Sequence, residues 1–197
     1  MSSKSDPHRD VSRPGRLGNP EMTMLDDMRL DPRVRKAMSG MPAGDPAALL
    51  PQVSLSSSYE DCLQWVAAME TLHNEQDSAM LATMPDFSDV TTEKRTIVSD
   101  EGDEIDLFIE RPKEAVGVLP CVVHIHGGGM AFTTAMAAGA TRWRKTLVQQ
   151  GLVVVAVEFR NSGGELGNHP FPAGLDDCAT AIQWVNKNRS VLNISSL

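Results

Sequence analysis

The spacing of apolar residues changes along the chain, and the first clear pattern is helical. Five apolar side chains between residues 62 and 72 fall on one face of a helix, because they occupy positions i, i+3, i+4, i+7 and i+10. They are Cys62, Trp65, Val66, Met69 and Leu72. Ser57 or Ser58 is placed to cap the start of this helix with its hydroxyl group. The pattern predicts an amphipathic helix that packs on another part of the chain.

From Val90 onward, apolar and polar residues alternate, which is typical of half-exposed strands. Residues 93–98 and 105–110 both show this period of two, and the segment Asp100–Asp103 between them contains a glycine and acidic residues. The order strand, turn, strand predicts an antiparallel hairpin. Pro112 ends the second strand because proline has no N–H group to donate.

Two later segments, Val116–His124 and Leu152–Phe159, are almost continuously apolar, as expected of strands buried on both faces of a sheet. The residues between them predict a helix, which Gly151 follows as a C-cap. Its apolar residues are Met136, Ala140, Trp143 and Leu147. The order strand, helix, strand favours two parallel strands joined by a right-handed crossover.

A second helix is predicted after Pro172, since proline suits a first helical turn. Its apolar face consists of Leu175, Cys178, Ala179, Ile182 and Val185, and the helix ends near Asn188. Asp176 and Asp177 fall in its first turn, where the positive end of the helix dipole explains two carboxylates without a catalytic role. The fold class is therefore α/β, with parallel strands in a helix-covered sheet.

Three regions follow from these patterns. Residues 1–21 combine Ser, Pro, Gly and mixed charge without periodicity, which is typical of a disordered arm. Residues 22–87 contain eight of the 11 methionines and several prolines, which predicts an irregular, cap-like helical segment without a core of its own. The methionines form either helical core or a pliable wall around an apolar substrate. Residues 88–197 hold the predicted sheet and its two helices.

The composition fits a folded protein and excludes several partners. With 197 residues and 41% hydrophobic content, the chain is long enough to bury a core. The net charge of −8, without a dense run of Lys or Arg, excludes an electrostatic footprint for nucleic acid or an anionic membrane. Cys62, Cys121 and Cys178 lack zinc-ligand spacing, so we expect free thiols. Residues 1–20 lack the apolar core of a secretory signal, and we predict a cytoplasmic location.

The stretch with the clearest chemistry is Leu119–Met130, where an apolar strand runs into Gly127, Gly128 and Gly129. Consecutive glycines let backbone N–H groups approach an anion closely. A phosphate group and the oxyanion of an acyl-transfer intermediate are the two anions to consider. The phosphate-binding patterns G-x-x-x-x-G-K-[ST] and G-x-G-x-x-G are both missing, and His126 precedes the glycines. The pattern therefore favours the oxyanion.

His126-Gly-Gly-Gly129 after an apolar strand resembles the HGGG loop of α/β-hydrolase esterases and lipases, specifically the hormone-sensitive-lipase-like group. Glu158–Asn161 and His169–Asp177 resemble that family's next landmarks in order and spacing, so the resemblance covers residues 90–197. It implies an α/β-hydrolase fold, a preceding cap segment, and hydrolysis of short or medium acyl esters through an acyl-serine without a cofactor. In such enzymes Gly127 and Gly128 would form the oxyanion hole, and His126 and Gly129 would support the loop.

The chain departs from this family at the nucleophile. The family places its serine in G-x-S-x-G after the oxyanion loop, followed by Asp or Glu and then His. No G-x-S-x-G occurs in these 197 residues. We therefore expect a hydrolase fold truncated after the helix that precedes the nucleophile elbow, without a catalytic triad. Ser162 and His169 are an alternative pair, but a loop serine has no evident means of activation.

His124 and His126 form the one candidate metal site. In an extended strand, His-x-His places both rings on one side, and His169 or Glu158 could supply a third ligand. The glycines after His126 are better explained by oxyanion binding, and no further ligand follows at local spacing. We expect neither a metal nor a cofactor.

Two functions are open at this stage. The first is the N-terminal part of a serine carboxylic-ester hydrolase, inactive alone, whose complete enzyme acts on a small-molecule ester. The second is a non-catalytic α/β-hydrolase-like binding or regulatory protein. In the complete fold an elbow strand would flank the strand that ends at His124. Its free edge therefore predicts self-association of this chain.

Overall fold

The computed structural model describes residues 22–39 and 53–195, so the predicted arm at residues 1–21 lies outside the described part. The chain divides into two compact units, Met1–Asp45 and Pro46–Leu197. In the first unit, η1 spans Met24–Asp26 and α1 spans Pro32–Met38. The Asp31 carboxylate caps α1 by accepting a hydrogen bond from the Arg33 N–H group at 2.8 Å.

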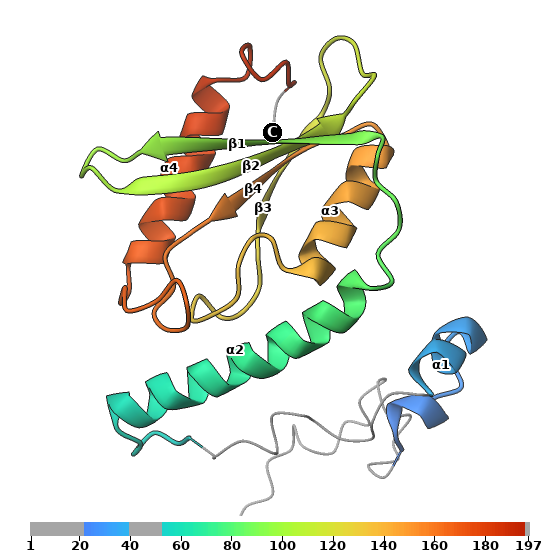
Figure 1. Ribbon diagram of the computed structural model, residues 1–197, viewed down its shortest axis with the longest axis vertical. Helices are drawn as coiled ribbons and strands as arrows, with labels where there is room; N and C mark the ends of the chain where they lie inside the picture. The colour runs from blue at the N-terminus through green and yellow to red at the C-terminus, as the bar shows by residue number, and fades with distance from the viewer. Residues whose placement is uncertain (1–21, 40–52, 196–197) are drawn as a thin grey trace, which may run out of the picture. The chain divides into compact units, whose positions relative to one another are not determined.

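The second unit contains a four-stranded sheet with helices on both faces (Figure 1). The strands are β1 (Val90–Val98), β2 (Glu104–Pro112), β3 (Cys121–Ile125) and β4 (Val153–Glu158), in the spatial order β1-β2-β4-β3. The helices are α2 (Tyr59–Leu81), α3 (Ala138–Gln149) and α4 (Ala173–Lys187). β2 pairs antiparallel with β1 and β4, while β3 and β4 are parallel. The predicted hairpin and parallel pair are confirmed.

The two faces of the sheet make different contacts because side chains alternate along each strand. The main apolar core lies between the sheet and α4. It includes Val153, Val155, Val157, Cys178, Ala181 and Val185. The alternate strand residues face α3, where Glu110 of β2 meets Arg144. α3 and α4 therefore cover opposite faces, as Figure 1 shows.

The strand predicted over Val116–His124 is shorter than expected, since β3 begins at Cys121. Gly117 has a φ of +88°, which turns the chain, and Pro120 has no N–H group for a ladder. Val116 and Val118 are 92% and 65% exposed, so the apolar run does not correspond to one buried strand.

The outer edge of β3 is only partly paired. Leu119 forms a parallel bridge with Ile194, in which its N–H donates to the Asn193 carbonyl (3.1 Å) and its carbonyl accepts from the Ser195 N–H (2.8 Å). Within the described ranges, β4 is the only strand that pairs with Cys121–Ile125. The other edge strand, β1, carries Glu93, Lys94 and Arg95, charged residues that discourage edge-to-edge pairing.

The buried face of α3 differs from the predicted one. α3 buries Ala138, Thr141, Arg144 and Val148. Met136 precedes the helix, and Trp143 is 51% exposed with its ring 5.4 Å from that of His124 on β3. Trp143, one residue of the predicted apolar face, thus lies beside β3. The buried stripe contains Arg144, and the spacing of apolar residues alone could not predict that an arginine is buried there.

The buried face of α4 is also shifted. Cys178 and Val185 are buried as predicted, but Leu175 and Ile182 are 48% and 40% exposed. Trp184, on the opposite flank of α4, lies under the Arg95 guanidinium of β1. Leu175 and Ile182 therefore lie on the flank of α4 that faces away from β1.

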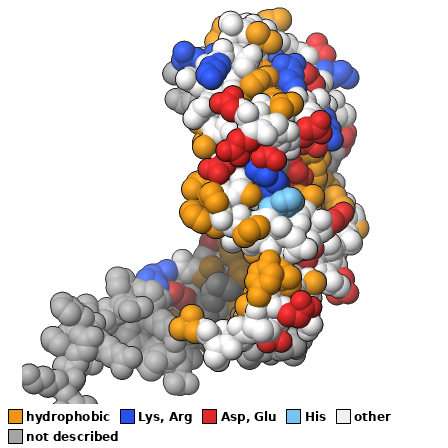
Figure 2. Space-filling view, turned by 90° about the vertical axis from the view of Figure 1, so that its left-hand side faces the viewer, with side chains coloured by type: hydrophobic (Ala, Val, Ile, Leu, Met, Phe, Trp, Pro, Cys, Tyr) orange, Lys and Arg blue, Asp and Glu red, His pale blue; other side chains and the backbone are white. Residues whose placement is uncertain are grey.

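The predicted helix boundaries are largely confirmed. Ser58 caps α2 in a reciprocal capping box with Asp61. Gly151, with a φ of +89°, follows α3, and Asn188 is the C-cap of α4. None of the helices in the described ranges is long and apolar enough to cross a membrane. The face that carries the β1–β2 turn shows interleaved acidic and basic side chains without a continuous basic patch (Figure 2).

Candidate active site

The loop between β3 and α3, residues 126–137 (the glycine loop), forms one wall of a cavity of about 430 Å³. The cavity is lined by His73, Gln76, Asp77 and Met80 of α2, by His126, Gly127, Gly128, Phe132, Thr133 and Ala137 of the glycine loop, and by Gly139 and Ala140 of α3. The N–H groups of Gly127 and Gly128 donate to no other described residue. Both glycines line the cavity, and their N–H groups have no hydrogen-bond partner within the described ranges.

Two of the glycines have different steric requirements. Gly128 has a φ of +100°, and a Cβ atom at this position would overlap the Phe132 carbonyl oxygen and lie 2.5 Å from Thr133 Cγ2. A Cβ atom at Gly127 would meet nothing within 4 Å. Gly128 is therefore required by the fold of the loop, whereas Gly127 leaves open space beside its amide.

His126 braces the start of the glycine loop. The residue is 5% exposed, and its ring stacks on Phe159 of the segment after β4, with ring centroids 4.1 Å apart and planes 9° apart. Its Nδ1 atom lies 2.8 Å from the Gly127 carbonyl oxygen. Because a carbonyl oxygen can only accept, Nδ1 donates this hydrogen bond. His126 Nε2 lies 3.5 Å from Glu158 Oε1. The stacking and the Nδ1 bond fix the ring behind Gly127.

Three carboxylates hold backbone N–H groups of the loop and of the first turn of α3. Glu70 accepts from Thr133 (3.2 Å), Glu158 accepts from Ala135 (2.8 Å) and Asp77 accepts from Ala138 (2.5 Å). Figure 1 shows α2, which carries Glu70 and Asp77, running across the loops that follow β3 and β4.

The sequence patterns did not reveal these anchors. Glu70 and Asp77 do lie at helical spacing from Val66, so they flank the predicted apolar stripe of α2. Acidic side chains on the flank of a packing face are the signal that could have identified them.

A buried ion pair joins the sheet to the glycine loop. Arg144 of α3 and Glu110 of β2 have fully buried side chains, with Arg144 Nε 3.0 Å from Glu110 Oε2. Arg144 Nη1 also donates to the Ala135 carbonyl oxygen at 2.5 Å. Charges removed from water require such paired and hydrogen-bonded geometry.

The Ser162 and His169 pair is not assembled for catalysis. Ser162 donates from its Oγ (3.2 Å) and its backbone N–H (2.9 Å) to the carbonyl oxygen of Met130. His169 donates its backbone N–H to the Asn161 carbonyl, and no hydrogen bond joins the Ser162 and His169 side chains in the described structure. Ser162 instead ties its own loop to the glycine loop.

Asp177 has a different role from the helix-terminal one predicted. Its side chain is 2% exposed and accepts hydrogen bonds from Arg160 Nη2 (2.8 Å) and the Arg160 N–H (2.9 Å). Arg160 also pairs with Asp103 at 2.9 Å. Asp177 raises the pKa of the Arg160 guanidinium by hydrogen bonding to its charged form. The network joins the β1–β2 turn to α4 beside a second cavity of about 360 Å³, and Asp176 lines that cavity.

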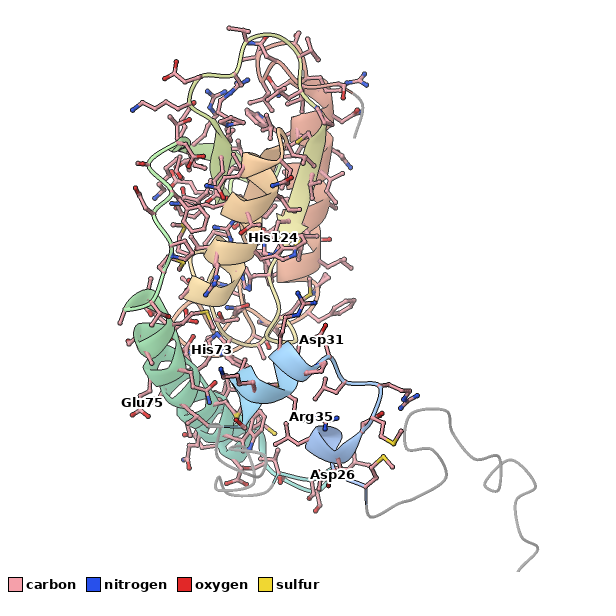
Figure 3. The ribbon with its side chains drawn as sticks, turned by 90° about the vertical axis from the view of Figure 1, so that its right-hand side faces the viewer. Asp26, Asp31, Arg35, His73, Glu75 and His124 are labelled. Carbon is pink, nitrogen blue, oxygen red and sulfur yellow. The ribbon has the colours of Figure 1, made fainter. Side chains whose placement is uncertain are left out.

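The rings of His124 and His126 pack against different aromatic side chains, Trp143 and Phe159 respectively. His124 lies beside α3, apart from His73 on α2 (Figure 3). Burial lowers the pKa of His124 to about 4, helped by the charges of Arg144 and His126, so its ring is neutral at neutral pH. No group of three or more His, Cys, Asp or Glu residues that could hold a metal ion occurs among the residues described.

Comparison with known proteins identifies esterase relatives. A family model described as BD-FAE matches residues 105–196. Carboxylesterase NlhH of Mycobacterium tuberculosis is 31% identical over 113 residues, which are 57% of this chain and 34% of that protein. Brefeldin A esterase, described as a bacterial homologue of human hormone-sensitive lipase, is 32% identical with a TM-score of 0.70, over 93% of this chain and 51% of that chain.

The chain is similar in sequence and in fold to esterases of the hormone-sensitive-lipase-like α/β-hydrolase group. Esterase Est22, 27% identical with a TM-score of 0.66, is similar over 87% of this chain and 50% of its own. The resemblance found in the sequence is therefore confirmed. The chain spans about a third of the length of the curated relative and about half of the two esterase structures.

Proposed function

We propose that the chain supplies the oxyanion-stabilising part of a serine carboxylic-ester hydrolase. The observation that carries this proposal is that Gly127 and Gly128 line the 430 Å³ cavity and that their N–H groups have no partner among the described residues. Such donors stabilise the negative oxygen of a tetrahedral intermediate, and one donor is typically worth about 3 kcal/mol of activation free energy. His126 and Gly129 support the loop that holds them.

The proposed substrate is a small ester with a short or medium acyl group. Met80, Phe132 and Ala140 provide an apolar part of the cavity wall, and Met80 belongs to the helical segment over residues 22–87 that we propose as a cap. The relatives' names support an ester: NlhH is a carboxylesterase, and the matched structure is brefeldin A esterase.

The attacking serine is proposed to lie outside these 197 residues, which contain no G-x-S-x-G. Ser162 is a poor substitute because its hydroxyl group already donates to the Met130 carbonyl. This chain alone is therefore expected to be inactive.

The test is to join residues 1–197 to the part of brefeldin A esterase that the chain does not match. The chimera should hydrolyse p-nitrophenyl acetate and react covalently with a fluorophosphonate probe, whereas the chain alone should do neither. A chimera that unfolds cooperatively but shows neither activity would contradict the oxyanion proposal. Hydrolysis by the chain alone, lost in Ser162→Ala, would contradict the absence of a nucleophile.

The second candidate is a non-catalytic binding protein, and the outer edge of β3 favours it. The Val153 N–H donates to the Pro120 carbonyl, so residues 120, 122 and 124 face β4, and Cys121, Val123 and Ile125 direct their N–H groups outward. Trp143 of α3 is 51% exposed and lies beside β3, with its ring 5.4 Å from that of His124. When this chain is the only protein present, we propose that a second copy pairs there.

Analytical ultracentrifugation over a range of concentrations tests this association. The unmodified chain should self-associate, and Ile125→Lys should shift it toward monomer, because a lysine at a strand edge opposes pairing. Val98→Lys is the matched control, since Val98 is exposed on the opposite edge strand, and it should leave association unchanged. A monomer at every concentration, or an equal effect of both lysines, would refute pairing at β3.

A further inference from the structure

Glu70 is the only buried residue among those described in α2, although it is charged. It is 8% exposed, and the partners of its carboxylate are backbone N–H groups and not a cation. Glu70 Oε1 accepts from Thr133 at 3.2 Å, and Oε2 accepts from Glu165 at 2.7 Å. A buried carboxylate is costly unless it is hydrogen-bonded, so these two contacts explain its position. One side chain of α2 thus joins two loops that are distant in sequence.

On the first side of this bridge, Thr133 is held in an unusual conformation. Its φ is +70°, which is uncommon for a β-branched residue. Glu70 holds its N–H group, and the Asn161 amide donates to its carbonyl oxygen at 2.8 Å. Both peptide groups that flank the Thr133 side chain are therefore fixed by buried side chains.

The position of Thr133 determines the space available to Gly128. A Cβ atom at residue 128 would lie only 2.5 Å from Thr133 Cγ2, so the Gly128 backbone packs directly against this side chain. A change in the position of Thr133 must therefore alter the surroundings of the Gly128 amide. Glu70 reaches the proposed oxyanion donor through a single intermediate residue.

On the second side of the bridge, the chain makes room for the carboxylate at Gly164. Gly164 has a φ of +67°, and a Cβ atom there would lie 2.7 Å from both carboxylate oxygens of Glu70. Ser162, in the same loop, donates to the Met130 carbonyl of the glycine loop. The loop after β4 and the glycine loop are therefore held together both directly and through Glu70.

We propose that Glu70 is a positioning residue for the oxyanion loop, acting through Thr133 on the amide of Gly128. In this role α2 does more than cover the cavity, because it carries the side chain that preorganises one of its walls. The catalytic meaning of this role rests on the proposed function of Gly128, but the structural coupling can be measured without turnover.

The experiment compares Glu70→Gln with Glu75→Gln by NMR and amide hydrogen exchange on the full chain. A glutamine keeps one acceptor oxygen and replaces the other by an NH₂ donor, so it cannot accept both backbone N–H groups. We expect Thr133 or Glu165 to exchange at least about tenfold faster, as lost protection of one hydrogen bond implies. The Gly128 amide resonance should shift. Glu75 is exposed on the same helix, and its variant should match the unmodified chain (Figure 3).

The amides of Val154, Val155 and Ala156 in β4 distinguish a local effect of Glu70→Gln from a loss of global stability. These core amides should keep their protection against hydrogen exchange. Equal acceleration of these core amides would show that Glu70 only stabilises the fold, and unchanged exchange at both Thr133 and Glu165 would show that the bridge is absent. Either result overturns the proposal. If Glu70→Gln does not fold, Glu70→Asp, which keeps the charge but shortens the side chain, is measured in the same way.

The two proposals can fail independently. Suppose that Glu70→Gln accelerates exchange at Thr133 or Glu165 and shifts the Gly128 resonance, but the folded chimera is inactive. This result would support the positioning role of Glu70 and reject the ester-hydrolase function. An active chimera whose Gly128 resonance is unaffected by Glu70→Gln would retain the function and reject the positioning role.

Discussion

Replacing Arg144 by methionine is expected to lower the free energy of unfolding by about 3–5 kcal/mol, the range for breaking a buried ion pair from one side. The reason is that Glu110, whose side chain is fully buried, would be left without its cationic partner. The Ala135 carbonyl oxygen would lose its hydrogen bond from the same guanidinium. Urea denaturation followed by circular dichroism measures the change.

Two further variants identify the cause of this loss. Arg142→Met removes an exposed arginine from the same helix and should change the free energy of unfolding by less than about 0.5 kcal/mol. Glu110→Leu combined with Arg144→Met should be more stable than Arg144→Met alone, because no charge is then left buried and unpaired. A double variant that is no more stable would show that the loss comes from packing instead of the unpaired carboxylate.

Gly128→Ala is expected to destabilise the chain by about 2–4 kcal/mol, combining backbone strain at positive φ with overpacking. The added methyl group would overlap the Phe132 carbonyl oxygen and crowd the Thr133 side chain. The glycine loop must therefore shift to admit it. The same denaturation experiment measures the loss, and NMR shifts of the loop amides report the movement.

Gly127→Ala is the matched control, one residue earlier in the same loop. Its Cβ atom would enter open space, and no positive φ is required at this position. We expect its free energy of unfolding to stay within about 0.5–1 kcal/mol of that of the unmodified chain, the usual range for a glycine replaced without strain. Equal losses for both alanines would mean that the loop tolerates no side chain anywhere, in conflict with the space beside Gly127.

The sequence predicted most of the secondary structure because its signals are local. The alternation of residues 93–98 and 105–110 predicted the β1–β2 hairpin. The serines at 57 and 58 predicted a cap at the start of α2, and Ser58 is that cap. These features depend on neighbouring residues, whose spacing directly sets which side chains share a face. The apolar run at Val116–His124 predicted a strand that is too long. The turn at Gly117 and the missing N–H group of Pro120 prevent strand pairing before Cys121, where β3 begins.

The helical faces show where local spacing is insufficient. Trp143, Leu175 and Ile182 belong to the apolar faces predicted for α3 and α4, yet all three are about half-exposed. A helix can have a broader apolar arc than the stripe that one sheet covers, and the sequence does not say which part of the arc is buried. The position of each helix over the sheet decides this.

The sequence by itself determined the glycine loop and its relation to esterases, because His126–Gly129 is a contiguous pattern. The tertiary structure alone decided what holds that loop. Glu70 meets Thr133 across 63 residues of sequence, and Glu110 meets Arg144 across 34. In each contact a buried charged side chain meets a group that is distant in the sequence. The local spacing of apolar and polar residues therefore cannot predict the contact. The residues that indicate the chemistry of the loop are neighbours in the sequence, whereas the residues that hold the loop in place are distant in the sequence.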